Sequence, residues 1–276
     1  MGYTSCLVTS HGFRITSNYI YSQVNKMNVA ILIICTNSYL PLGLRLTNRF
    51  HHFYIGKSNI KFYLVSDKDP IPYLNKNINA SWIKNTHTSW VDATNSKFSN
   101  ILKLSNEPLD YIYYMDADTN IHNKFDDSFM LGEVVGAEHF GNQDWMSDVK
   151  NFDRNPQSKA YVPFDTKLDQ VYYHGAFFGG EKQKIINICR QLKINQEQDR
   201  LIHYEPAVND ESYINNYFHY NKPSKTILFT DFPFQVSDRA GIESNRDVNF
   251  DVQYLLDDIQ KHKNDLWDIK KGLVIN

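Results

Sequence analysis

The sequence lacks the features that mark membrane-spanning, nucleic-acid-binding and disulfide-rich proteins. Its longest apolar run, Val29 to Cys35, is far shorter than the roughly 18–20 residues that cross a bilayer. The formal net charge is −2, whereas proteins with a large nucleic-acid footprint usually carry a clear basic excess. The three cysteines, Cys6, Cys35 and Cys189, are odd in number and widely spaced. They predict neither a disulfide framework nor a metal-binding spacing, and a reducing compartment fits them best.

The sequence is nevertheless rich in the residues that build a folded core. Its 276 residues are 42% hydrophobic and include 18 Tyr and 17 Phe, which excludes a disordered or low-complexity chain. That length suffices for one large domain. Residues 1–26 are polar and aromatic without clear periodicity, and no long linker follows them. We therefore predict an N-terminal extension over residues 1–26 and a single domain over residues 27–276.

Strands and helices are predicted to alternate in the first half of the chain. Continuous apolar runs indicate strands at residues 28–35, 60–66 and 111–115, with helices between them at residues 40–55 and 94–105. This alternation is typical of an α/β fold with a Rossmann-like, mostly parallel central sheet flanked by helices. In the second half we expect an ordered loop at residues 144–167, a strand at 172–180 and helices at 181–196, 210–220 and 250–271.

Polar residues follow all three strands of the first half, at residues 35–37, 66–67 and 116–118. Because ligands of such sheets bind at the carboxyl ends of strands, we expect these residues to meet at one edge. Asp116 and Asp118 could together hold one divalent ion, and a nucleotide diphosphate would complete its shell. A solvated turn is the alternative interpretation. The same pattern also occurs in nucleotidyltransferases and phosphohydrolases.

Two later segments add candidate residues. Tyr172–Gly180 places small residues among aromatics, which lets a flat ligand approach the backbone, and His174 could bind a hydroxyl. Glycines of a bulge or turn, with a structural histidine, explain the same pattern. Asp210 and Glu211 open a predicted helix with Asn209 as its cap. Taken alone, that is ordinary placement of carboxylates at a helix N-terminus.

Four segments occur in the order Met115–Asp118, Arg154–Pro163, Tyr172–Gly180 and Asn209–Ser212. Together they resemble glycosyltransferase family 6, the family of the ABO blood-group transferases and α-1,3-galactosyltransferase. The resemblance covers roughly residues 28–230. It implies a GT-A fold and a retaining enzyme that moves galactose or N-acetylgalactosamine from a UDP-sugar to a galactoside hydroxyl in an α-1,3 linkage. Without the membrane stem of the animal enzymes, the chain resembles a soluble bacterial or phage-type member acting in the cytoplasm on a glycan or glycolipid.

The resemblance also implies roles for individual residues. Glu211 matches the carboxylate that acts as nucleophile or stabilises an oxocarbenium ion, and Asp116 and Asp118 match the ligands of Mn²⁺. The positions that match donor-binding residues are Thr36, Tyr39, Lys97, Asp116, Ala176 and Asp210. The positions that match acceptor-binding residues are His139, Asn151 and His174. Ala176 lies near the position that selects the transferred sugar, where its methyl group favours galactose.

The sequence departs from the family pattern at several positions. Lys97 replaces an arginine, so an ammonium point charge stands in place of a guanidinium group that donates two parallel hydrogen bonds. The positive charge of Lys97 is still expected to favour the ionised form of Glu211. Asn209 replaces a common histidine. Beyond about residue 231 the match fades, where Lys270 and Lys271 are candidates for a basic tail over the donor phosphates or for a solvated helix end.

These departures leave two other functions open. A catalytically silent carbohydrate-binding protein on the same fold would suit the aromatic content and the changed positions. A nucleotidyltransferase or another GT-A transferase would share the strand and its two aspartates. Either of those enzymes would leave the segments at 172–180 and 209–212 unexplained.

Overall fold

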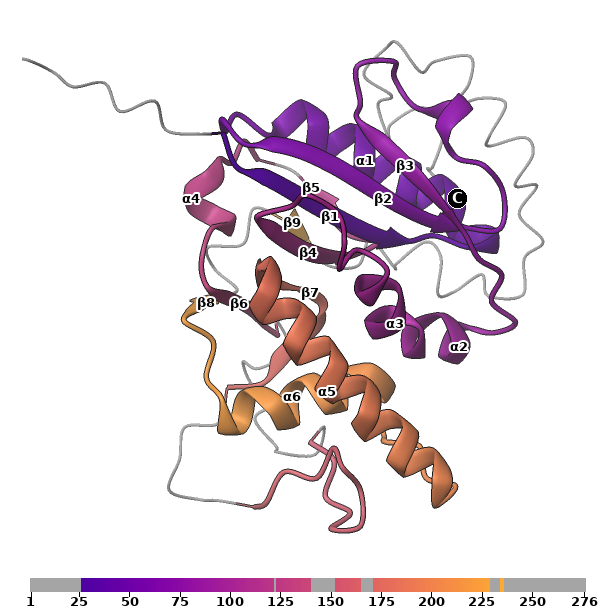
Figure 1. Ribbon diagram of the computed structural model, residues 1–276, viewed down its shortest axis with the longest axis vertical. Helices are drawn as coiled ribbons and strands as arrows, with labels where there is room; N and C mark the ends of the chain where they lie inside the picture. The colour runs from indigo at the N-terminus through magenta and orange to yellow at the C-terminus, as the bar shows by residue number, and fades with distance from the viewer. Residues whose placement is uncertain (1–25, 122, 140–151, 165–170, 229–233, 236–276) are drawn as a thin grey trace, which may run out of the picture.

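The computed structural model describes residues 26–121, 123–139, 152–164, 171–228 and 234–235. Its centre is a seven-stranded sheet with the order β3-β2-β1-β4-β7-β6-β8 (Figure 1). The strands of this sheet are β1 (Asn28–Ile34), β2 (Asn59–Ser66), β3 (Ala80–Lys84), β4 (Tyr111–Asp116), β6 (Val134–Glu138), β7 (Tyr173–Glu181) and β8 (Lys225–Ile227). A separate antiparallel pair consists of β5 (Asn120–Ile121) and β9 (Phe234–Gln235). The predicted α/β fold with a mostly parallel sheet is confirmed.

The direction of β7 decides which residues meet at the functional edge of the sheet. β1 pairs in parallel with β2 and with β4, so the carboxyl ends of these three strands lie at one edge, as predicted. β7 runs antiparallel to both of its neighbours, β4 and β6. The amino end of β7 therefore reaches the same edge as the carboxyl end of β4. This reversal brings the segment that begins at Tyr173 next to the one that follows Asp116.

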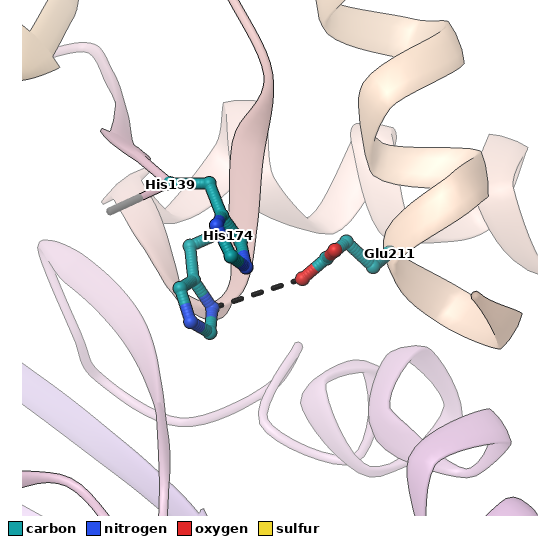
Figure 2. Close-up of side chains that lie close together, drawn as sticks. All are labelled: His139, His174 and Glu211. Carbon is teal, nitrogen blue, oxygen red and sulfur yellow. Dashed lines mark ion pairs between the residues drawn. The ribbon is translucent and has the colours of Figure 1, made fainter. Parts of the chain in front are cut away.

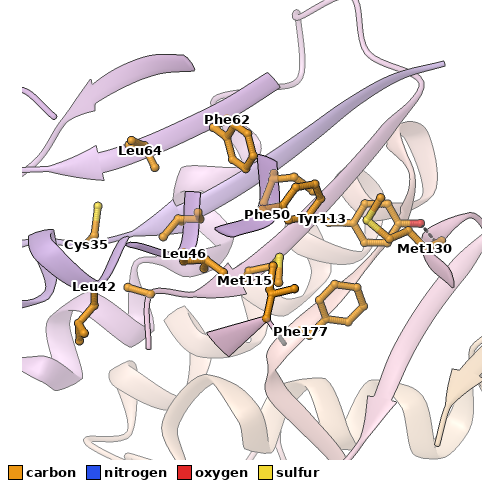
Figure 3. Packing of buried hydrophobic residues seen from close by; sticks show 14 of the residues in the cluster. Cys35, Leu42, Leu46, Phe50, Phe62, Leu64, Tyr113, Met115, Met130 and Phe177 are labelled. Atoms are coloured by element: carbon orange, nitrogen blue, oxygen red, sulfur yellow. Dashed lines mark hydrogen bonds between the residues drawn. The ribbon is translucent and has the colours of Figure 1, made fainter. Parts of the chain in front are cut away.

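Helices cover both faces of the sheet, and each face has its own core. They are α1 (Leu40–Phe53), α2 (Trp90–Asn95), α3 (Lys97–Leu102), α4 (Asp127–Met130), α5 (Lys182–Leu201) and α6 (Asn209–Tyr220). Odd-numbered residues of β1 pack with α1, β2 and the ring of Tyr113. Figure 3 shows part of this cluster, with Phe50 of α1, Phe62 of β2 and the ring of Tyr113. Even-numbered residues pack with α3, α5 and α6. An uninterrupted apolar strand is what burial on both faces requires. No helix in the described ranges is long and apolar enough to cross a bilayer.

Two expectations about helices are corrected. The single helix predicted at 94–105 is wrong, because α2 begins at Trp90 and ends before Ser96. The Ser89 hydroxyl accepts the amide of Asp92 and caps α2, while the Ser96 hydroxyl donates to a carbonyl of the same helix. The predicted cap at Asn209 is also wrong. Asn209 is the first residue of α6 and has a φ of 43°, and Val208 occupies the cap position. The helix predicted at 250–271 and the extension up to residue 25 lie outside the described residues.

Two consecutive glycines let β7 pack closely against its neighbours. A Cβ atom at Gly179 would lie 2.2 Å from a ring carbon of Tyr113 and 2.5 Å from the backbone oxygen of Ile112. Gly180 has a φ of +145°, and a Cβ there would lie 2.3 Å from the oxygen of Glu133. These two glycines of the 172–180 segment therefore serve close strand packing, and not the bulge or turn that the sequence left open as an alternative.

We predict that Gly179→Ala lowers the free energy of unfolding by about 2–3 kcal/mol, because the methyl group meets a backbone atom that cannot move independently. Denaturant titration measures this change. Gly132→Ala is the matched control, because there the nearest atom is a side-chain methyl of Val135 at 2.9 Å. A Cβ at Gly132 is also too close, but its cost should be smaller than that at Gly179, because a side chain can shift more readily than paired backbone. Equal losses in the two variants would show that the close approach of β7 to β4 is not the cause.

Candidate active site

Glu211 is held in one orientation by hydrogen bonds to both of its carboxylate oxygens. Oε1 accepts from the hydroxyl of Tyr172 at 2.7 Å, and Oε2 accepts from the backbone amide of Gly175 at 2.6 Å. A Cβ at Gly175 would lie 3.0 Å from the Cβ of Glu211, so glycine allows this approach. The Asn215 side chain, one turn along α6, both accepts from and donates to the backbone of Tyr173. These bonds fix α6 against the start of β7.

Two histidines lie beside this carboxylate (Figure 2). The rings of His139 and His174 stack with centroids 4.4 Å apart and an interplanar angle of 11°. His174 Nδ1 accepts from the amide of Ala176 at 2.9 Å and lies 3.7 Å from Glu211 Oε2. That acceptor role leaves the proton of a neutral His174 on Nε2. The predicted acceptor residues His139 and His174 are therefore brought together, whereas Asn151 lies outside the described residues.

Lys97 connects this carboxylate region to the two aspartates after β4. Its Nζ donates to Asp210 Oδ2 at 2.5 Å and to the backbone oxygen of Gly175 at 2.8 Å. It also lies 3.9 Å from Asp116 Oδ1 and 4.2 Å from the centre of the Tyr114 ring. Only 2% of the Lys97 side chain is exposed. A buried ammonium of this kind is stable only when its partners offset the loss of hydration.

Burial sets the ionisation of the two carboxylates at the start of α6. The pKa of Asp210 is raised to about 6, because loss of hydration outweighs the attraction of Lys97. The pKa of Glu211 is raised to about 7 by burial, which outweighs the lowering by Gly175, Tyr172 and Lys97. Lys97 therefore favours ionised Glu211, as predicted, but its effect is smaller than that of burial. For Lys97 itself, burial lowers the pKa, and the nearby carboxylates, led by Asp210, more than compensate and raise it.

A pocket of about 330 Å³ lies at the carboxyl ends of β1 and β4. Its lining includes Thr36, Tyr39, Trp90, Tyr114, Asp116 and Asp118. The predicted donor residues Thr36 and Tyr39 therefore share one cavity with the two aspartates. Trp90, which is 43% exposed, also lines the pocket and was not predicted, because the sequence gives no sign that its ring stays exposed.

The two aspartates suit a hard divalent ion. Asp116 Oδ1 accepts from the hydroxyl of Tyr114 at 2.5 Å, and Asp118 is buried beside the pocket. Next to them the buried hydroxyl of Thr119 has no hydrogen-bond partner among the described residues. Carboxylate and hydroxyl oxygens are the ligands that Mg²⁺, Ca²⁺ and Mn²⁺ prefer. The donor set therefore fits the predicted metal.

A second group of possible metal ligands consists of His139, His174 and Glu211. Their ligand atoms lie within 4.8 Å of one another. The two rings are nearly parallel, however, so the lone pairs in their planes do not converge on one point. His174 Nδ1 is also occupied by the amide of Ala176. This arrangement suits hydrogen bonding to hydroxyl groups better than shared binding of an ion.

We predict that Lys97→Met lowers the free energy of unfolding by about 3 kcal/mol, because the Asp210 carboxylate is left buried without its partner. Adding Asp210→Asn should recover most of this loss. The control is Lys103→Met at the end of the same helix, where the side chain is exposed and the expected change is below about 0.5 kcal/mol. Chemical denaturation of the four proteins measures these values. No recovery in the double variant would contradict a direct pairing.

Comparison with known proteins confirms the predicted family. The sequence pattern of glycosyltransferase family 6 matches residues 11–241. An O-antigen biosynthesis glycosyltransferase of Escherichia coli, WbnI, is 28% identical over 203 residues, which is 71% of this chain and 84% of that protein. Histo-blood group ABO system transferase 2 of Rattus norvegicus is 24% identical over 217 residues, which is 74% of this chain and 63% of that protein.

A third relative is globoside α-1,3-N-acetylgalactosaminyltransferase 1 of Gallus gallus, which is 31% identical over 127 residues, or 46% of this chain and 36% of that protein. The chain thus spans most of the bacterial relative and less than two thirds of the two animal ones. The family match begins at residue 11, within the predicted extension, so the boundary at 26/27 stays a prediction. Because the match covers most of the sequence and the sheet has the mixed, mostly parallel order of a GT-A-like fold, the chain belongs to glycosyltransferase family 6 and is a hexosyltransferase.

Proposed function

We propose that the protein is a retaining, metal-dependent transferase that moves galactose from a UDP-sugar to a hydroxyl of a galactoside, forming an α-1,3 linkage. N-acetylgalactosamine is the second candidate for the transferred sugar. One observation carries the proposal: Lys97 joins the pocket that contains Asp116 to the site of Glu211. The names of the relatives support it, since they include ABO system transferases and an α-1,3-N-acetylgalactosaminyltransferase.

The donor half of the reaction belongs to the pocket. Thr36 and Tyr39 bind the uridine, and Asp116 and Asp118 would hold a divalent ion such as Mn²⁺. When bound, the ion would supply Lewis-acid stabilisation of negative charge on the leaving group. The Lys97 ammonium lies 3.9 Å from Asp116 and adds a fixed positive charge in a region sheltered from water. This cation is in place before the reaction begins, so no reorganisation is needed when charge develops.

The transfer half belongs to the start of α6. Glu211 acts on the anomeric carbon, either as a covalent nucleophile or as the carboxylate that stabilises an oxocarbenium ion, and Asp210 contacts the donor sugar beside Lys97. Both roles of Glu211 need the ionised form. The hydrogen bonds from Tyr172 and Gly175 support that form and aim the carboxylate.

The acceptor side is assigned to the two stacked histidines and to Asn151. His174 offers Nε2–H to an acceptor hydroxyl, because Ala176 occupies its Nδ1. Ala176 is 1% exposed and has a methyl group where glycine would leave more room, which favours galactose over the bulkier N-acetylated sugar. The acceptor is a glycan or glycolipid that ends in a galactoside.

We predict metal-dependent transfer from UDP-galactose that EDTA abolishes. Glu211→Gln should lower kcat at least about 100-fold, because the amide cannot supply a negative charge. Asp118→Asn should raise the Mn²⁺ concentration needed for half-maximal activity. Glu197→Gln, the same change at an exposed site on α5, is the control and should leave activity unchanged. Assays would compare UDP-galactose with UDP-N-acetylgalactosamine on plain and fucosylated galactosides.

Two results would contradict the proposal. Full activity in EDTA would remove Asp116 and Asp118 as metal ligands. Sugar binding without turnover of any donor would favour a catalytically silent carbohydrate-binding protein.

A pH dependence follows from the buried carboxylate. Because the pKa of Glu211 is raised to about 7 and its active form is ionised, kcat/KM should fall as the pH decreases through about 7. Tyr172→Phe removes a donor to the carboxylate and should shift this fall upward by about one pH unit. Tyr220→Phe, at an exposed position on α6, the helix that carries Glu211, should leave the pH of this fall unchanged. A constant kcat/KM from pH 5 to 8 would contradict the assignment.

A further inference from the structure

His87 lies behind the wall of the pocket and has no role in the reaction described above. It is buried, and its Nδ1 lies 3.2 Å from the hydroxyl oxygen of Thr36, which lines the pocket. The other ring nitrogen, Nε2, lies 3.1 Å from the side-chain nitrogen of Asn85. The backbone oxygen of His87 accepts from the side chain of Asn37 at 3.1 Å. The ring is therefore held from both sides, directly behind a predicted donor-binding residue.

The surrounding bonds determine where each proton lies. The backbone amide of Thr86 donates to Asn85 Oδ1 at 2.9 Å, so the amide oxygen is on that side and the NH₂ group faces His87. His87 Nε2 must then accept this NH₂ group. A neutral imidazole has one acceptor and one donor nitrogen, so Nδ1 carries the proton and donates to Thr36 Oγ1. Burial lowers the pKa of His87, which keeps the ring neutral.

The hydroxyl proton of Thr36 is consequently directed to the pocket. Its oxygen already accepts from His87, so its own hydrogen must go to another acceptor. Thr36 is the cap residue of the short helix η1 (Asn37–Tyr39), yet its side chain makes no capping bond. Across the described part of the chain, no other hydrogen-bond partner of this hydroxyl is observed. The cavity of about 330 Å³ that Thr36 lines is the remaining direction.

We propose that Asn85 and His87 are positioning residues that fix Thr36 as a hydrogen-bond donor to an oxygen of the bound uridine. This inference rests on the proposed function, because it needs a uridine nucleotide in the pocket. A Thr36 hydroxyl fixed in this way selects ligands that place an oxygen acceptor next to it. An amino group there could use only the second lone pair of the hydroxyl and would leave the hydroxyl hydrogen without an acceptor, which costs affinity.

The first test reads the proton on His87 directly. The ¹⁵N chemical shifts of the histidine rings distinguish Nδ1–H from Nε2–H, and the His87→Gln variant identifies the signals by their loss. We expect Nδ1–H in the wild-type protein. In Asn85→Asp the carboxylate can only accept, so the proton should move to Nε2 at pH 8.5. A wild-type ring protonated on Nε2 would overturn the proposal.

The second test measures UDP affinity by calorimetry with Mn²⁺ present. Thr36→Val and Asn85→Asp should each weaken binding about tenfold, as expected for one lost hydrogen bond to a buried acceptor, while Thr36→Ser keeps most of the affinity. Asn77→Asp makes the same charge change in the exposed segment before β3, at the opposite edge of the sheet, and is the control. Unchanged affinity in Thr36→Val would overturn the proposal.

Comparing the affinities for UDP and CDP shows which atom of the nucleotide Thr36 contacts. A tenfold preference for UDP that disappears in Thr36→Val places the contact at position 4 of the base, where the two bases differ. An equal loss for both nucleotides places it at an oxygen that they share. If the wild-type protein binds no UDP, the proposed function itself fails. The ring-proton measurement would still show whether the hydrogen-bond chain exists.

Discussion

The ammonium group of Lys97 is the constraint on which the site depends. It is almost fully buried, so it must find polar partners inside the protein, and its two hydrogen bonds and one ion pair reach three different elements. Asp210 comes from the start of α6, the oxygen of Gly175 from β7, and Asp116 from the end of β4. A single cation thus fixes the distance between the pocket and the carboxylate of Glu211. A flexible lysine achieves this through point contacts, where an arginine would impose the plane of its fork.

The reversed direction of β7 brings one partner of this cation, the backbone oxygen of Gly175, to the functional edge. In an all-parallel sheet the amino end of a strand would lie at the opposite edge, far from the residues that follow β1 and β4. Antiparallel pairing with β4 brings Gly175 to the functional edge, and the missing side chain there lets Glu211 reach the backbone amide. Sheet topology, one glycine and one buried carboxylate therefore depend on one another.

Much of this fold could be predicted because its central strands are buried on both faces. The runs that form β1, β2 and β4 are continuous and apolar, and such patterns are read easily. Strand β3 was missed because its residues are mostly half-buried and mix polar with apolar types. The division of the predicted helix at Ser96 was missed because a hydroxyl that bonds to a nearby carbonyl leaves no periodic signal.

The candidate site could also be predicted only where its residues stand in short sequence motifs. Asp116, Asp118 and Glu211 stand in recognisable short segments, so their grouping could be predicted. Tyr172 and His87 were not, because each acts through a partner far away in sequence, Glu211 and Thr36 respectively. A single sequence does not show which distant residues form hydrogen bonds with each other. The roles of the predicted residues toward ligands remain predictions.

The central place of β4 has a consequence for how the protein unfolds. Paired residues of β4 and β1 lie 82 positions apart in the sequence, and those of β4 and β7 lie 62 to 70 apart. Because loop-closure entropy rises only slowly with loop length, the two pairings cost nearly the same chain entropy. β4 takes part in both pairings, one on the side of the pocket and one on the side of Glu211. Loss of β4 would therefore dismantle both halves of the site together, so the site unfolds as one cooperative unit.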